Sequence, residues 1–133
     1  MGMELSFLAL LLFKHAIADL WLQSLRTPNL KSNYFGGHWH YFDHGALTLF
    51  VAIFLAPWQF AILVGCIDYF CHWHVDFLKH RLLKYYEVRS EDSPSLYWAV
   101  QASDQMLHYL TYVLIAFSYQ PVSYTHLTLP TKA

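Results

Sequence analysis

Acidic residues and histidines recur every four residues inside four stretches of otherwise apolar sequence. The runs are His15-x3-Asp19-x3-Gln23, His40-x3-His44, Asp68-x3-His72-x3-Asp76-x3-His80 and Asp104-x3-His108. A step of four residues turns an α-helix by roughly 40° and rises about 6 Å, so each run lines one helix face. Ionisable groups inside apolar helices are costly and usually serve a function. The pattern therefore predicts helices whose polar faces meet in a shared interior.

Composition favours a membrane location for these helices. Hydrophobic residues make up 56% and charged residues 13% of the 133-residue chain, whereas charged residues usually make up about 25%. A chain of this length has room for one domain. We expect an integral membrane protein with the lipid bilayer as its partner, and a soluble helical bundle is the alternative. The net charge of −1 and the lack of a basic run give no sign of a nucleic-acid partner.

Proline, glycine and polar residues divide the chain into an all-α, four-helix transmembrane bundle. Pro57 ends the second helix, and Ser93-Pro94 supplies an N-cap and a first-turn proline for the fourth. The short turn at Pro57 makes an antiparallel hairpin of helices two and three. The expected helices cover about residues 3–24, 40 or 43 to 56, 58–86 and 94–119.

The distribution of basic residues predicts the orientation of this bundle. With four crossings, the two longer loops share one side with Arg26, Lys31, Lys79, Arg81, Lys84 and Arg89. The positive-inside rule makes that side cytoplasmic and puts the short turn and both termini outside, as in a bacterial inner-membrane protein. Lys79 and Arg81 are interpreted as anchors at the membrane interface. All four polar faces then fall at one depth, in the cytoplasmic half of the bundle.

Such a convergence of carboxylates and imidazoles predicts a divalent metal site. An unpaired Asp in a membrane costs about 2.5–3.5 kcal/mol, and a cation would neutralise several at once. Ligands of this kind without thiolates suit Zn²⁺, Mn²⁺ or Fe²⁺. The expected ligands are His15, Asp19, His44, His72, Asp76, Asp104 and His108. The expected outer hydrogen-bonding partners are Gln23, His40, Asp68 and Gln105.

A structural interpretation stands beside the metal hypothesis. Histidine and aspartate in a helical bundle are often hydrogen-bonded structural residues and bind nothing. His38, His74 and Asp43 are interpreted in this way, as loop or outward-facing groups. The two cysteines, Cys66 and Cys71, are five residues apart and point to different helix faces. They predict neither a disulfide nor a thiolate metal site.

The four polar runs together resemble a known family. His15 to Gln23, His40 to His44, His72 to Lys79 and Asp104-Gln105-x2-His108 are similar to the signature of an uncharacterised family of small bacterial and phage membrane proteins. That family is classed as a domain of unknown function. The resemblance implies a four-helix membrane domain and no particular activity. A looser likeness is to membrane-bound metal-dependent hydrolases, which also place His and Asp on membrane helices.

Three functions are compatible with the pattern. The first is a membrane-embedded metal-dependent hydrolase of a lipid or amphipathic substrate, in which Asp76 or Asp104 acts as a base. The second is a b-type haem protein, because His15, His44, His72 and His108 put one imidazole on each helix. The third is a non-enzymatic scaffold, an ion or proton pathway, or a subunit of a membrane partner or homo-oligomer.

The end of the chain does not resemble natural sequence. Val122-Ser-Tyr-Thr-His-Leu-Thr-Leu-Pro-Thr131 resembles a translated transposase-type sequencing adapter. We therefore expect a native membrane domain over residues 1–121 and a non-native segment over 122–133, and we leave His126 out of the site.

Overall fold

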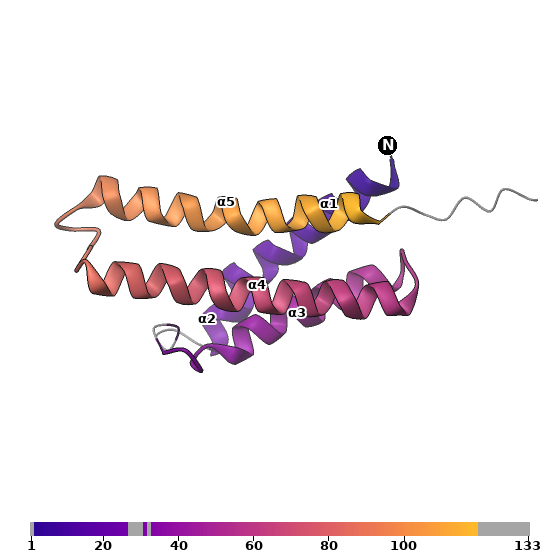
Figure 1. The fold of residues 1–133 in the computed structure, drawn as a ribbon, viewed down its shortest axis with the longest axis horizontal. Helices are drawn as coiled ribbons and strands as arrows, with labels where there is room; N and C mark the ends of the chain where they lie inside the picture. Colours follow the sequence, from indigo (N-terminus) through magenta and orange to yellow (C-terminus); the bar gives the residue numbers. More distant parts are fainter. Residues whose placement is uncertain (1, 27–30, 32, 120–133) are drawn as a thin grey trace, which may run out of the picture.

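The chain folds into four helical segments joined by short connections (Figure 1). The computed structural model describes residues 2–26, 31 and 33–119. The first segment is continuous and comprises α1 (Met3–Ala16), the π-helix η1 (Ile17–Leu22) and α2 (Gln23–Arg26). The others are α3 (His38–Ile53), α4 (Trp58–Tyr85) and α5 (Pro94–Ser118). The described residues contain no strand, so the all-α class and the four expected helices are confirmed. The expected segment 122–133 lies outside the described residues.

Each helix reverses the direction of the one before it. The N-terminus, the α3–α4 turn and the end of α5 lie at one end of the molecule, and the α4–α5 loop lies at the other (Figure 1). Pro57 is the N-cap residue of α4, as its fixed φ and missing N–H allow. Ser93 occupies the N-cap position of α5, but its side chain makes no capping hydrogen bond. Pro94 and the backbone bond from the Tyr97 N–H to the Ser93 carbonyl (2.9 Å) define that helix start instead.

Helices α3 and α4 form the expected hairpin and approach each other at two facing glycines. A Cβ atom added at Gly45 would lie 2.8 Å from the Gly65 carbonyl oxygen. A Cβ atom added at Gly65 would lie 3.0 Å from both the Gly45 carbonyl oxygen and the Leu49 Cβ. Small residues at helix crossings allow such backbone contact, which strengthens packing where water does not drive association.

The π-helical segment in the first helix was not anticipated from the sequence. It spans Ile17–Leu22 and carries Asp19, one of the expected ligands. π-Helical turns are rare and often lie at functional sites. Hydrophobic periodicity does not reveal them, because one wide turn leaves the pattern on either side nearly unchanged.

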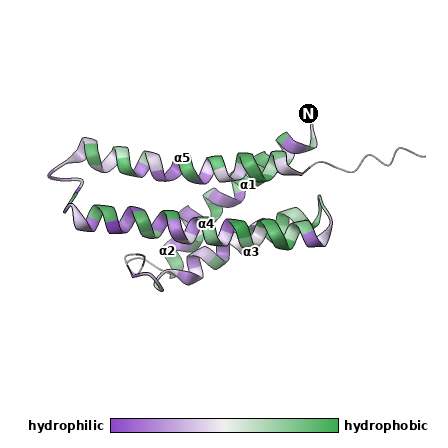
Figure 2. Ribbon diagram, in the orientation of Figure 1, coloured by the Kyte–Doolittle hydropathy of each residue, from purple (hydrophilic) through white to green (hydrophobic). Residues whose placement is uncertain are grey.

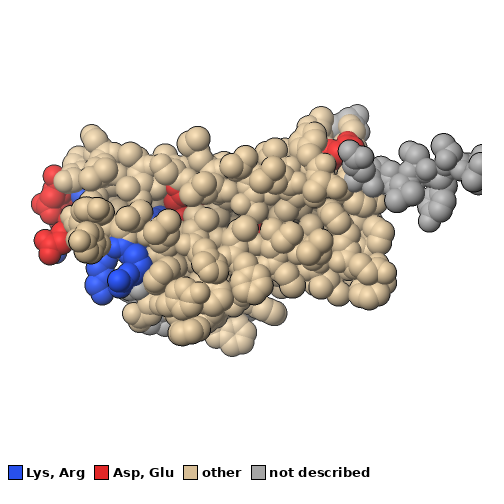
Figure 3. All heavy atoms as spheres, viewed as in Figure 1, with Lys and Arg blue, Asp and Glu red and all other residues tan. Residues whose placement is uncertain are grey.

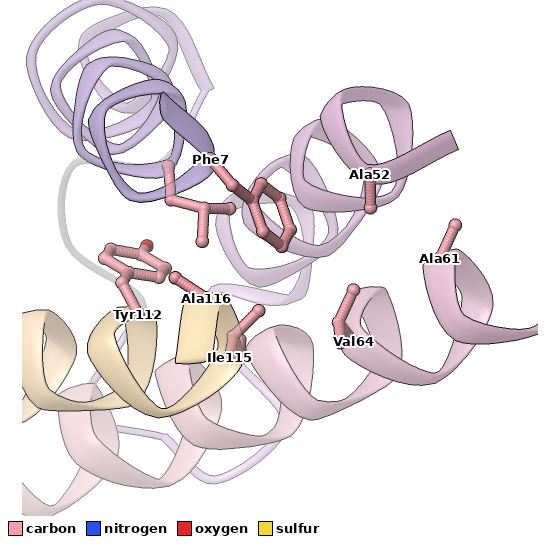
Figure 4. Packing of buried hydrophobic residues seen from close by; sticks show 8 residues of the cluster. Phe7, Ala52, Ala61, Val64, Tyr112, Ile115 and Ala116 are labelled. Carbon is pink, nitrogen blue, oxygen red and sulfur yellow. The ribbon is translucent and has the colours of Figure 1, made fainter. Parts of the chain in front are cut away.

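The interior changes from apolar to polar along the length of the bundle. Near the N-terminus of α1, the helices enclose Phe7, Leu11, Ala52, Ala61, Val64, Tyr112, Ile115 and Ala116 (Figure 4). The other half of the interior holds the buried histidines and aspartates. Along α4, the ribbon turns from mostly hydrophobic near the α3–α4 turn to mostly hydrophilic near the α4–α5 loop (Figure 2). Polar side chains therefore occupy one half of the core only.

One helix of the described chain is long and apolar enough to cross a membrane by length and composition. It covers Met3–Leu25, with 23 residues and a mean hydropathy of 1.7. The histidines and aspartates of α4 and α5 lower the apolarity of those longer helices. The expected four crossings thus have direct support for one helix, and the membrane bundle is taken up below as a proposal.

Gly45→Ala is expected to lower the free energy of unfolding by about 1–3 kcal/mol, because the methyl group forces the two backbones apart. The midpoint of thermal unfolding, followed by circular dichroism, measures the effect. Phe50→Leu on the exposed face of α3 serves as the control and should leave the midpoint nearly unchanged. An unaltered midpoint in Gly45→Ala would show that the helices do not touch there.

A candidate metal site in the polar interior

All four helices direct polar side chains into the same half of the core. The buried ones are Lys14 and His15 from α1; His40, Asp43, His44 and Thr48 from α3; Asp68, His72 and Asp76 from α4; and Asp104 and His108 from α5. Asp19 lies beside them with 23% of its side chain exposed. The seven expected ligands therefore form one contiguous cluster, as the four-residue spacing predicted. Whether they bind a metal stays a prediction.

Four imidazoles lie at the centre of the cluster. The rings of His44 and His72 stack at 3.6 Å between centroids, and those of His72 and His108 stack at 3.9 Å. The His15 ring centroid lies 5.1, 5.3 and 5.5 Å from those of His44, His72 and His108. One imidazole from each helix thus contributes to a compact, buried group.

Three sets of side chains bring possible ligand atoms within 4.8 Å of one another: His15, His44 and His72; Asp19, His40 and His44; and Asp76, Asp104 and His108. Ligands of a tetrahedral Zn²⁺ ion, each about 2.0–2.1 Å from the metal, lie roughly 3.4 Å from one another. Side-chain rotations that move the ligand atoms by about 1 Å would therefore bring any of these sets to coordination distance.

His72 is oriented by a carboxylate in the way that metal-binding histidines usually are. Its Nδ1 donates a hydrogen bond to Asp68 Oδ1 at 2.8 Å. Its Nε2 is buried and has no hydrogen-bond partner among the described residues. Since Nδ1 carries the proton, Nε2 presents a bare lone pair to the interior. A carboxylate behind an imidazole fixes the tautomer and strengthens the nitrogen as a ligand.

Hydrogen bonds fix His15 and His44 in the same network. His15 Nε2 donates to Gln105 Oε1 at 3.0 Å, and His15 Nδ1 then accepts from the Tyr112 hydroxyl at 3.0 Å. His44 Nε2 donates to Asp19 Oδ1 at 3.0 Å. Gln105 therefore lies where an outer partner was expected, in contact with both an imidazole and, at 3.4 Å, Asp19 Oδ2.

Lys14 is a member of the cluster that the sequence analysis missed. It is buried and forms an ion pair with Asp68, and its Nζ also donates to the Tyr112 hydroxyl at 2.8 Å. The Thr48 hydroxyl donates to the same carboxylate. A signal was present: Leu11, Lys14, His15 and Ala18 are all buried and follow the i, i+3, i+4, i+7 spacing of one helix face.

Lysines also neutralise the carboxylates at the loop end of the cluster. Lys31 Nζ lies 2.5 Å from Asp76 Oδ2, and Lys79 Nζ lies 2.8 Å from Asp104 Oδ2. The interpretation of Lys79 as an interface anchor is therefore wrong, because its side chain reaches inward to Asp104. A metal ion is therefore not needed to neutralise these aspartates, because Asp68, Asp76 and Asp104 each pair with a lysine.

The remaining expected partners lie at the edge of the network. Gln23 Oε1 accepts from Lys31 at 2.9 Å. His40 Nε2 lies 3.3 Å from Asp19 Oδ1 and 3.5 Å from Asp76 Oδ2. Asp43 is buried, contrary to the expectation. Because α3 begins at His38, Asp43 lies inside the helix, one turn beyond His40, and faces inward.

The other two outward assignments have different outcomes. His74 is exposed, as expected, and bonds the Phe70 carbonyl on its own helix at 2.7 Å. His38 is partly buried, since it is stacked on the Tyr69 ring and lies 2.7 Å from its hydroxyl. Neither histidine contacts the central imidazoles.

Comparison with known proteins identifies a family without assigning an activity. A family model described as "Protein of unknown function (DUF3307)" matches residues 7–132. Neither the curated proteins nor the solved structures gave a match.

Lys14→Met should destabilise the protein by about 3–5 kcal/mol, because it leaves the Asp68 charge buried without its ammonium partner. The double variant Lys14→Met/Asp68→Asn should recover part of that loss. Chemical denaturation of wild type, of Lys14→Met, of Asp68→Asn and of the double variant under the same conditions gives the coupling energy. If the two single losses simply add in the double variant, the pair does not interact.

Proposed function

The chain belongs to the DUF3307 family of proteins of unknown function, and on this premise we propose that it is an integral membrane protein that holds a divalent transition-metal ion between its helices. The bare Nε2 of His72, set by Asp68 and facing two further imidazoles, is the observation that carries the metal assignment.

Membrane insertion is supported by the distribution of polar and apolar side chains. The interior holds lysines, histidines and aspartates, while large apolar residues are exposed on every helix, among them Phe13 (66%), Phe50 (59%), Ile62 (46%) and Leu114 (63%). Exposing such an apolar surface to water is unfavourable, whereas exposing it to lipid is not. Only 28% of the apolar window in Met3–Leu25 is buried, whereas a core helix of a soluble protein would be mostly buried.

The placement of charge supports the same interpretation. On the face shown in Figure 3, charged side chains gather at the end with the α4–α5 loop, and the middle of the molecule is almost uncharged. Helices α4 and α5 have 28 and 25 residues, or about 42 and 38 Å, enough for a hydrocarbon layer of about 30 Å. The basic loop end would face the cytoplasm under the positive-inside rule.

We assign the metal to His15, His44 and His72, with Asp19 close enough to serve as a fourth ligand. Metal binding would replace the hydrogen bonds that His15 Nε2 and His44 Nε2 donate to Gln105 and Asp19. His15 Nε2 and His44 Nε2 lie 3.3 and 3.0 Å from the Asp19 carboxylate. Three imidazoles and one carboxylate suit Zn²⁺, and Mn²⁺ or Fe²⁺ also accept such ligands. The Asp76, Asp104 and His108 set is less suited, since lysine ammonium groups already neutralise both carboxylates.

A hydrolytic reaction is the activity that this centre would best support. A bound cation would activate a water molecule and polarise an ester or phosphate group. The polar part of the interior lies toward the loop end of the bundle only, because the other half is filled by the apolar cluster around Phe7, Leu11, Val64 and Ile115. A polar interior that is closed at one end fits a binding or reaction centre better than a pathway through the membrane.

The second candidate function is a metal-free proton relay or structural core. It is favoured by the three lysine–aspartate pairs, which neutralise most of the interior charge without a cation. A b-type haem is disfavoured, because the imidazoles stack directly on one another at 3.6 and 3.9 Å and have carboxylates beside them. A haem needs a broad apolar slot between its axial ligands.

Protein purified from zinc-supplemented cells should contain about one equivalent of metal, and His72→Ala should contain at least tenfold less, because one of three imidazole ligands is lost. Elemental analysis by mass spectrometry measures both. His74→Ala, on the exposed face of the same helix, is the matched control and should keep its metal. Metal-free wild type would leave the proton relay or structural core as the function.

The membrane location predicts the reactivity of the exposed Cys66, which lies on α4 about 12 Å from the start of that helix at Trp58. In opened membrane vesicles, a water-soluble maleimide should label Lys84→Cys near the loop end and leave Cys66 unmodified until detergent is added, because lipid covers it. Gel-shift labelling gives the result. Rapid modification of Cys66 in the opened vesicles before detergent is added would contradict a lipid-facing α4.

A further inference from the structure

A groove between α1 and α5 opens from the outer surface of the bundle onto the polar cluster. Its volume is about 500 Å³, within the roughly 300–1,000 Å³ typical of ligand sites. Leu8, Leu12, Tyr109 and Val113 supply apolar walls, and the polar groups at its floor are His15, Asp19 and Gln105. A second groove, lined by Lys79 and Asp104 among others, has no histidine in its lining.

The groove is polar at one end and apolar at the other. On α1 its lining runs from Leu8 and Leu12 to Asp19, and on the antiparallel α5 from Val113 to Gln105. The polar end is the one nearer the basic loops, and the lining from Leu8 to Asp19 extends along the first helical segment for about 16 Å at 1.5 Å per residue. In a membrane, a lipid has the same polarity, with its head near the interface and its chain toward the middle.

Asp19 differs in its partners from the three buried aspartates of α4 and α5. Asp68, Asp76 and Asp104 each receive a lysine ammonium group. In the part of the chain that the structure describes, Asp19 contacts only imidazoles and the Gln105 amide. It is also the one of the four that is partly exposed, and it is exposed to the groove.

We infer that this groove binds a single membrane lipid with a primary ammonium head group, an aminophospholipid such as phosphatidylethanolamine. One acyl chain lies along Leu8, Leu12 and Val113, and the ammonium group donates to Asp19. It thereby gives Asp19 the cationic partner that Asp68, Asp76 and Asp104 obtain from lysine. The inference rests on the proposed membrane location and concerns the metal-free protein, because a metal bound through Asp19 would compete with the lipid ammonium group for this carboxylate.

The head group distinguishes this lipid from others. Phosphatidylcholine carries a quaternary ammonium without N–H donors and cannot hydrogen-bond a carboxylate. Phosphatidylglycerol brings no cation to offset the Asp19 charge. The preference should therefore follow the primary amine rather than the acyl chains.

Native mass spectrometry of EDTA-treated protein, released from micelles with equal phosphatidylethanolamine and phosphatidylcholine, tests the inference. Wild type should retain one lipid and prefer phosphatidylethanolamine by about tenfold. Asp19→Asn should abolish the preference. Val113→Trp should fill the groove and lower retention about tenfold, whereas Leu110→Trp on the neighbouring exposed face of α5 should not. Leu12→Trp on the opposite wall provides a second blocking variant.

Each other outcome has a definite meaning. Equal retention of both lipids, or a preference that survives Asp19→Asn, would overturn the head-group assignment. Lipid retention that is unchanged in both Val113→Trp and Leu12→Trp would overturn the groove as a lipid site. A dimer mass without lipid would do the same. Metal content is measured on untreated samples, so loss of the metal proposal and loss of the lipid proposal are seen separately. Labelling of Cys66 tests the membrane location on its own.

Discussion

Carboxylates buried between helices dominate the energetics of this protein. An isolated ionised aspartate in such an interior would cost several kcal/mol, so each must be matched by donors from neighbouring helices. Asp68 shows how this is done: a lysine from α1, a threonine from α3 and a histidine one turn along α4 converge on its two oxygens. Because these partners come from three helices, the pairing fixes both the rotation and the depth of each helix.

The division of the core into two halves follows from the same pairing. Each polar group in such an interior must be placed to meet its partners, since an unsatisfied group is costly in a medium of low polarity. The apolar half needs no such matching and packs through Phe7, Val64 and Ile115, while the facing glycines Gly45 and Gly65 bring α3 and α4 into backbone contact. The polar half thus determines how the helices are arranged, and the apolar half fills the rest of the interior.

Two features of the polar interior distinguish it from a purely structural network. The lysines neutralise the carboxylates nearest the loops and on α4, but they leave Nε2 of His72, at the centre of the imidazoles, without a hydrogen-bond partner among the described residues. Within the same described part of the chain, Asp19 at the floor of a groove has no ammonium partner. The proposed metal would bind in the interior and the proposed lipid at its lateral opening, where the two would compete for Asp19.

The sequence by itself determined the helices, their approximate ends and the convergence of His15, His44, His72 and His108, because a four-residue spacing maps directly onto one helix face. It also pointed to Asp68 and Gln105 as partners of histidines. Only the tertiary structure decided that Lys14 and Lys79 turn inward, that Asp43 is buried and that Asp19 lies in a π-helical turn beside a groove. A long lysine side chain can reach either solvent or a neighbouring helix from the same backbone position. The choice depends on which carboxylate the next helix presents at that depth, and no local pattern contains that information.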